Sequence, residues 1–191
     1  PALRALGVQR VSVNLSTRDL LDLELPQRLQ AILGRLGVAP QAFCLEITES
    51  AIMDEPQRAL AILEALSAAG FKLSIDDFGT GYSSLAYLKR LPVDELKIDK
   101  SFVMAMERDA DDAKIVRSTI DLAHNLGLSV VAEGVENAAV YRQLQALGCD
   151  EGQGYHMARP MPAPEMAAFA ARWRAQALPA PASDSLLVAT D

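Results

Sequence analysis

Residues 73–81 read LSIDDFGTG, a short apolar run that ends in the adjacent carboxylates Asp76 and Asp77 and leads into a glycine-punctuated loop. The same pattern, an apolar run closed by a polar side chain, recurs along most of the chain, at Asn14, Glu46, Lys97, Glu133 and Gln153. Most of the intervening stretches have the pattern of amphipathic helices. An α/β barrel gathers reactive groups in this way, at the carboxyl ends of its parallel strands.

The apolar runs predict strands, and the amphipathic stretches predict helices. We expect strands at 10–15, 43–48, 72–77, 94–98, 128–133 and 150–154. Helices are expected at 18–36, 56–69, 83–90, 105–126, 137–147 and 163–176. Glycines follow four of these helical runs, where a left-handed C-cap is wanted, at positions 37, 70, 127 and 148. Strict alternation of strand and helix implies a parallel sheet with right-handed crossovers.

Two α/β architectures fit this alternation. A doubly wound open sheet would carry a glycine fingerprint after its first strand, whereas Asn14-Leu15-Ser16 stands there. Polar groups at six strand ends favour a TIM-like (β/α) barrel, since an open sheet concentrates its ligands at one switch point. Six strands in 191 residues are too few for an eight-stranded barrel of about 250 residues. We therefore expect an incomplete barrel, with about six of eight βα units present and the missing strands before Pro1.

The composition limits the domain organisation and the classes of ligand. We expect one barrel domain over residues 1–176 and a disordered tail or linker over 177–191, where Ala, Pro and Ser predominate. The 18 basic and 25 acidic residues give a net charge of −7, which argues against binding to duplex DNA or RNA. No membrane segment is expected, and a cytoplasmic location is predicted, either as a free protein or as part of a membrane-anchored parent.

Oxygen-bearing side chains at the strand ends predict a site for hard divalent cations. Asn14 or Asp77 alone can be a helix cap, but Glu is a poor cap, so Glu46 and Glu133 are harder to explain structurally. Together with Asp76 they supply five oxygen ligands, enough for two octahedral Mg²⁺ or Mn²⁺ ions that each keep waters.

Lys97 separates two reaction classes. A strand-end lysine in a barrel can form a Schiff base if its pKa is depressed. Nearby carboxylates would instead keep it an ammonium, which suits a phosphoryl oxygen or the attacking water. A surface lysine beside a strand is the simpler alternative.

The loop after the Asp pair has three possible roles. Its glycines, Gly79 and Gly81, can let backbone N–H groups approach a phosphate or act as hinges, or the loop can be an ordinary tight turn.

Taken together, these segments resemble the EAL-domain family, the bacterial phosphodiesterases that act on cyclic di-GMP. The resemblance runs from about Val8 to Phe169 and rests on six blocks in order: VNLS at 13–16, LEITES at 45–50, DDFGTGYSSL at 76–85, KID at 97–99, AEGVE at 132–136 and GQGY at 152–155. It implies a TIM-like barrel, two magnesium or manganese ions, and cleavage of cyclic di-GMP to linear pGpG.

The resemblance also implies a role for each site residue. Asn14, Glu46 and Asp76 would hold one metal, and Asp76, Asp77 and Glu133 the second. Glu133 is the candidate base, and Lys97 would hold the water or the phosphate. Gln153 would support the metal-bound water network, and Glu49 would anchor the loop that contains Gly79, Thr80, Gly81 and Tyr82.

One part of the family pattern is missing: none of the six expected strands carries the Glu-Ala-Leu motif with its following Arg. The expected function is therefore cyclic di-GMP hydrolysis by the intact parent domain, with this chain alone inactive. A catalytically inactive cyclic di-GMP sensor is the alternative. The resemblance further implies a homodimer fused to sensory or GGDEF-type domains.

Overall fold

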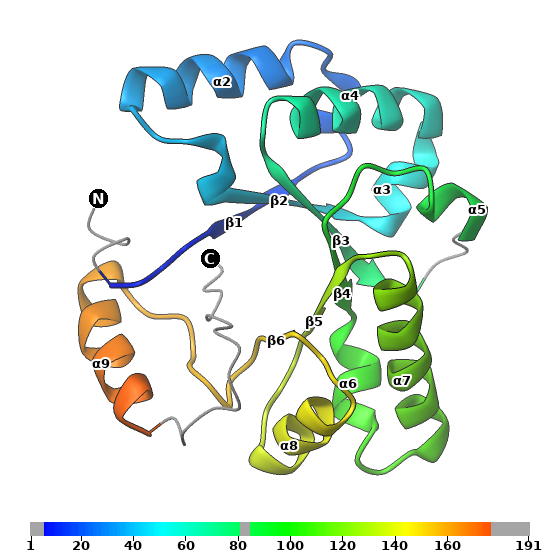
Figure 1. Cartoon of the computed structure of the whole chain (residues 1–191), viewed down its shortest axis with the longest axis vertical. Helices are drawn as coiled ribbons and strands as arrows, with labels where there is room; N and C mark the ends of the chain where they lie inside the picture. The colour runs from blue at the N-terminus through cyan, green and yellow to red at the C-terminus, as the bar shows by residue number, and fades with distance from the viewer. Residues whose placement is uncertain (1–5, 81–84, 177–191) are drawn as a thin grey trace.

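The fold is a curled sheet of parallel strands with helices on its outer side (Figure 1), described for residues 6–80 and 85–176 by a computed structural model. The strands of this sheet are β1 (Val11–Leu15), β2 (Phe43–Thr48), β3 (Lys72–Phe78), β4 (Glu95–Ile98), β5 (Ser129–Ala132) and β6 (Glu151–Gly152). They lie in the order β1-β2-β3-β4-β5-β6, and every neighbouring pair is parallel. Strand order never reverses, which excludes the doubly wound sheet and confirms the incomplete barrel.

Helices follow the strands in alternation. They are α2 (Leu25–Leu36), α3 (Glu49–Asp54), α4 (Pro56–Ala68), α5 (Leu85–Leu88), α6 (Lys100–Ala105), α7 (Ala110–Asn125), α8 (Ala138–Ala146) and α9 (Met166–Gln176). Short 3₁₀ turns lie at η1 (Asp19–Leu21), η2 (Pro40–Ala42) and η3 (Ala163–Glu165). In Figure 1, α2 and α4 lie above β1 to β3, while α6, α7 and α8 lie below, around β4 and β5. The tail predicted at 177–191 lies outside the described residues.

Some helix boundaries differ from the predicted ones, and at α3 and α7 a capping side chain sets the start of the helix. The predicted helix 105–126 is preceded by α6, and α7 begins only after Asp109, whose side chain accepts the Asp111 N–H. Helix α3 was not predicted from the sequence pattern. Thr48 caps it by accepting the Ala51 N–H. The expected helix 18–36 is divided into η1 and α2, and Pro26 lies in the first turn of α2.

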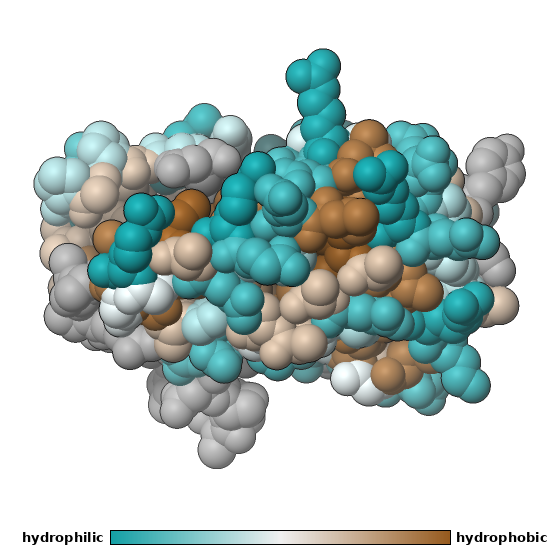
Figure 2. Space-filling view, turned by 90° about the horizontal axis from the view of Figure 1, so that it is seen from above, coloured by the Kyte–Doolittle hydropathy of each residue, from teal (hydrophilic) through white to brown (hydrophobic). Residues whose placement is uncertain are grey.

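The two faces of the sheet have different chemistry. On the outer face, Leu73, Ile75 and Ile98 join the apolar core formed with the helices. The alternate residues point to the concave face, where buried Ser74 and Lys97 are found. Figure 2 shows that the molecule, viewed from above, is covered mainly by polar side chains with separate apolar patches between them. No helix in the described ranges combines the length and apolarity needed to cross a membrane.

We expect Leu63→Ala to lower the free energy of unfolding by about 2–5 kcal/mol, because Leu63 on α4 is fully buried and its loss leaves a cavity. Leu36→Ala is the matched control, since Leu36 at the end of α2 is 68% exposed. Urea denaturation followed by circular dichroism measures both changes. Equal losses for the two variants would show that α4 does not pack on the sheet as described.

Candidate metal centre

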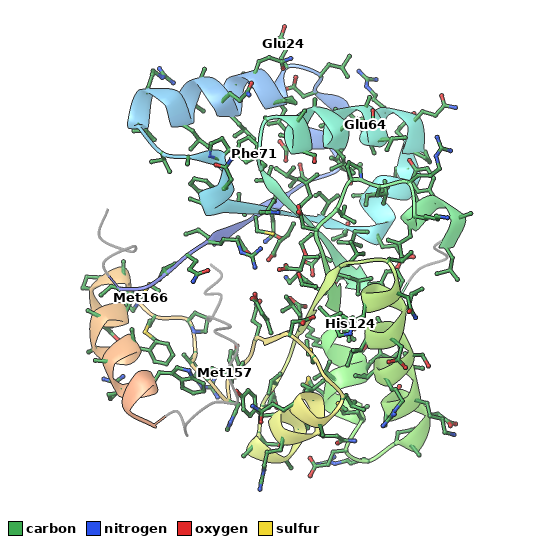
Figure 3. The ribbon with its side chains drawn as sticks, in the orientation of Figure 1. Glu24, Glu64, Phe71, His124, Met157 and Met166 are labelled. Atoms are coloured by element: carbon green, nitrogen blue, oxygen red, sulfur yellow. The ribbon has the colours of Figure 1, made fainter. Side chains whose placement is uncertain are left out.

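The predicted site residues meet at the carboxyl ends of the strands, on the concave face. The parallel register places Asn14 of β1 opposite Glu46 of β2, and Thr48 of β2 opposite Asp76 of β3. Lys97 lies in β4, Glu133 directly follows β5, and Gln153 directly follows β6. Figure 3 shows side-chain oxygen atoms gathered in the space enclosed by the curved strands. Residues far apart in sequence therefore share one site.

Lys97 lies at the centre of this site. Its Nζ atom lies 2.6 Å from Oε1 of Glu133, 2.9 Å from Oε2 of Glu46 and 3.1 Å from Oδ1 of Asp76. The Lys97 and Glu46 side chains are each 2% exposed. One ammonium thus contacts carboxylates from β2, β3 and the loop after β5.

The charge state of Lys97 follows from these partners. Burial alone would lower the pKa of the Lys97 ammonium, but Glu133, Glu46 and Asp76 outweigh burial and raise it above its ordinary value. Lys97 therefore remains protonated. A Schiff-base lysine requires the opposite shift, so the geometry favours the ammonium reading of this residue.

Three carboxylates form a cluster that could hold a cation. Oxygen atoms of Asp76, Asp77 and Glu133 all lie within 4.8 Å of one another. Burial, opposed by Lys97, raises the pKa of the Glu133 carboxyl, and the charges of Asp76 and Glu46 add to this rise. Next to this cluster, the Oε1 atom of Glu46 is buried and has no hydrogen-bond partner. An orphaned carboxylate oxygen beside an all-oxygen donor set fits a hard divalent cation.

Asp77 adopts an unusual backbone conformation. Its φ of 55° lies in the left-handed region, and no other described non-glycine residue has a positive φ. Such a conformation is costly for a residue with a Cβ and is found preferentially at functional sites. The Asp77 N–H donates to Oδ1 of Asp76 at 3.0 Å. The strain turns the chain at the point where both carboxylates enter the cluster.

Asp99 is a neighbour of the site that strand-end reasoning missed. Burial, the charge of Asp76 and a hydrogen-bonded contact with the side chain of Asp99 raise the pKa of the Asp77 carboxyl. Asp99 also caps α6 by accepting the Ser101 N–H at 2.9 Å. Its only sequence signal was its place in the block Lys97-Ile98-Asp99.

The loop after the Asp pair is held by Glu49. Oε2 of this buried residue accepts the Gly79 N–H at 3.1 Å, and the Thr80 hydroxyl donates to the Asp77 carbonyl at 2.9 Å. Gly79 has a φ of 99°, and a Cβ there would lie 3.1 Å from the Phe102 ring. Gly81 and Tyr82, the other predicted loop residues, lie outside the described residues.

Backbone contacts fix the segment around Gln153. Its N–H donates to the Ala132 carbonyl at 2.8 Å, and its carbonyl accepts the Val135 N–H at 3.0 Å. A Cβ on Gly154 would lie 2.3 Å from the Val135 carbonyl oxygen, so only glycine fits there. This close approach ties β6 to the loop that carries Glu133.

We expect Lys97→Met to destabilise the metal-free protein by about 3–5 kcal/mol, because three carboxylates then lose their shared buried cation. The control is Lys114→Met, which breaks an ion pair with Asp111. The Lys114 and Asp111 side chains are 74% and 84% exposed. That change should cost less than about 1 kcal/mol. Chemical denaturation in the presence of a chelator measures both. A loss for Lys97→Met as small as that of the control would mean that the carboxylates are solvated rather than paired.

Comparison with known proteins places this site in a family context. The bifunctional diguanylate cyclase/cyclic di-GMP phosphodiesterase MucR of Pseudomonas aeruginosa is 47% identical over 161 residues, which are 84% of this chain and 24% of that protein. A solved structure described as the PaMucR phosphodiesterase in complex with c-di-GMP superposes with a TM-score of 0.79 at 46% identity, covering 82% of this chain and 64% of that one. The chain therefore spans only part of its relatives.

A second relative was solved with a metal ion. Klebsiella pneumoniae BlrP1, solved as a manganese/cy-diGMP complex, superposes with a TM-score of 0.72 at 34% identity, over 78% of this chain and 38% of that one. The family model described as EAL domain matches residues 2–160, most of the sequence. This chain belongs to the EAL domain family.

Proposed function

We propose that this domain, in its complete protein, hydrolyses cyclic di-GMP to linear pGpG with two divalent cations, Mg²⁺ or Mn²⁺. The observation that carries the proposal is the buried cluster in which Lys97 contacts Glu46, Asp76 and Glu133. The family supports the substrate, since the MucR phosphodiesterase was solved with c-di-GMP.

The charge of the site explains the need for cations. Four carboxylates (Glu46, Asp76, Asp77 and Glu133) surround one ammonium, so the metal-free site repels a phosphodiester. Asn14, Glu46 and Asp76 would hold one ion, and Asp76, Asp77 and Glu133 the other. When bound, such ions neutralise phosphate charge and acidify water.

The chain's own groups then have separate tasks. The Lys97 ammonium donates a hydrogen bond to a phosphoryl oxygen or to the attacking water and keeps that atom in place. Glu133 accepts the proton that this water loses, a role that suits a carboxylate whose pKa is raised. The water oxygen forms a bond to phosphorus, the bond between phosphorus and the 3′-oxygen breaks, and that oxygen leaves with a proton from solvent.

The supporting residues act on position. Glu49 holds the Gly79 backbone and thereby the strained turn at Asp77. Gln153, fixed by its backbone contacts with Ala132 and Val135, would support the water network. The complete protein is further proposed to be a homodimer in which this domain is located in the cytoplasm and is fused to sensory or GGDEF-type domains.

We expect Asp76→Asn and Glu133→Gln, each made in the full-length protein, to lower the rate of cyclic di-GMP hydrolysis in Mg²⁺ by at least about 100-fold. Each change removes a charged ligand or the base while keeping the side-chain shape. Asp111→Asn, on the exposed surface of α7, is the control and should keep wild-type turnover. Separation of pGpG by chromatography measures the rate.

Two outcomes would contradict the proposal. Wild-type turnover in either site variant would show that these carboxylates do not hold the reacting centre. Binding of cyclic di-GMP in Ca²⁺ without any turnover of the unmodified protein in Mg²⁺ or Mn²⁺ would identify a sensor instead.

A further inference from the structure

A second set of charged side chains lies on the concave face, nearer the amino ends of the strands. Arg10 directs its Nη2 atom to Oε1 of Glu151 at 3.0 Å and to Oε2 of Glu95 at 3.4 Å. Glu95 is 3% exposed, and the Arg10 and Glu151 side chains are 27% and 16% exposed. These three residues are here called the Arg10 cluster. No hydrogen bond or ion pair joins them to the carboxylates that surround Lys97.

The Arg10 cluster connects strands that the sheet itself keeps apart. Arg10 directly precedes β1, and Glu151 lies in β6, so the two residues come from opposite ends of the strand order. Glu95 lies in β4, between them. A single guanidinium reaches both carboxylates only because the sheet curls, and Arg10 therefore bridges the concave face from one edge to the other.

The Arg10 cluster and the candidate metal centre share strands and face. Side chains two residues apart on a strand point to the same side of the sheet. Glu95 therefore lies on the same face as Lys97, two residues nearer the amino end of its strand, and Glu151 lies likewise relative to Gln153. Arg10 precedes Asn14 by four residues, which again places both on one face. A shift of β1 relative to β4 or β6 at the Arg10 cluster would be transmitted to the site.

The chemistry of the Arg10 cluster suits a fixed spacing. Burial raises the pKa of Glu95, and a hydrogen bond with Ser74 and the charge of Arg10 oppose this rise. Burial and the charge of Glu95 raise the pKa of Glu151, and Arg10 again opposes the rise, so the guanidinium favours both charged forms. The planar fork of arginine can engage two carboxylates at once, whereas a lysine ammonium is a point charge on a flexible stem. Removing the cation from partly buried carboxylates leaves them uncompensated, so their strands would move apart or admit water.

We propose that Arg10 is a positioning residue that fixes β1 relative to β4 and β6, and thereby sets the distances among Asn14, Lys97 and Gln153. The inference rests on the proposed metal site for its functional consequence, and on the ion pairs of Arg10 for its structural one. Nothing in the reaction requires Arg10 to touch a metal ion or the substrate.

The test compares three arginine variants of the full-length protein. Arg10→Met removes the charge but keeps much of the side-chain length, and Arg10→Lys keeps the charge without the fork. Arg28→Met is the matched control, because Arg28 forms an ion pair with Asp22 on the surface and is 58% exposed. Mn²⁺ affinity is measured by electron paramagnetic resonance, without substrate.

A metal-free distance measurement provides the second readout. Nitroxide labels are placed by Gln9→Cys, just before β1, and Gln145→Cys, on α8 before β6, both exposed positions. Cys44 and Cys149 are replaced by alanine in all the proteins compared. Double electron–electron resonance then reports the distance between the start of β1 and the end of α8, the helix that precedes β6.

We expect Arg10→Met to weaken Mn²⁺ binding by about tenfold and to broaden the label distance distribution. Tenfold is the lower limit of the losses caused by removing a direct partner of a metal ligand, and Arg10 acts only through strand spacing. Arg10→Lys should show smaller changes in Mn²⁺ affinity and in the label distance distribution, and Arg28→Met should change neither quantity. If Arg10→Met does not fold, Glu151→Gln replaces it, with a smaller change expected in the same directions.

Specific results would overturn the inference. A variant with a lower melting temperature but unchanged Mn²⁺ affinity and unchanged label distances would show that Arg10 stabilises the fold without positioning the site. A broadened distance with unchanged affinity would refute the link to the metal centre. If the unmodified protein binds no Mn²⁺, the proposed metal site fails, and an unchanged label distance in Arg10→Met would independently refute the positioning role.

Discussion

The ion pairs of Lys97 are the interaction on which the site depends. This buried ammonium contacts carboxylates that arrive from β2, β3 and the loop after β5, while Lys97 itself comes from β4. Such an arrangement requires four consecutive parallel strands to be in register, because a one-residue slip would turn each side chain to the opposite face. The register that aligns Asn14 with Glu46, and Lys97 with Val131, is therefore both a packing requirement and a requirement of the chemistry.

The same site carries energetic costs that a purely structural core would avoid. Asp77 has a left-handed backbone, Oε1 of Glu46 is buried without a partner, and burial raises the pKa of Glu133. Apolar residues in place of Glu46 and Glu133 would remove the buried carboxylates, and glycine in place of Asp77 would remove the backbone cost. Bound cations would supply the charge that these groups lack, so the strain and the orphaned oxygen are understandable as preparation for a ligand.

Much of the fold and the position of the site were predictable from local patterns. Strand ends such as Asp76-Asp77 and Glu133 could be recognised because the pattern, an apolar run followed by a polar residue, lies within a single strand. The helix expected at 105–126 begins only at Ala110, because its start depends on a capping bond that Asp109 makes rather than on periodicity. The close approach of Gly154 to Val135 and the contact of Asp77 with Asp99 depend on which loops meet in space, and no local pattern contains that information. The same holds for Arg10, whose partners lie 85 and 141 residues away.

The concave face thus has two charged layers with different requirements. Around Lys97, near the carboxyl ends of the strands, the negative charge exceeds what one ammonium can balance, so cations can be accommodated. In the Arg10 cluster, nearer the amino ends of the strands, Arg10 contacts both Glu95 and Glu151, and the excess of negative charge is smaller. A barrel with an apolar interior would be cheaper to fold, since each buried charge must recover its lost hydration through its partners. Directional ion pairs hold strands at defined distances, whereas apolar packing alone tolerates small rearrangements. The proposed metal ligands come from four different strand ends, those of β1, β2, β3 and β5, and would need that precision. This gives a physical reason why charged side chains also occupy the part of the concave face nearer the amino ends of the strands.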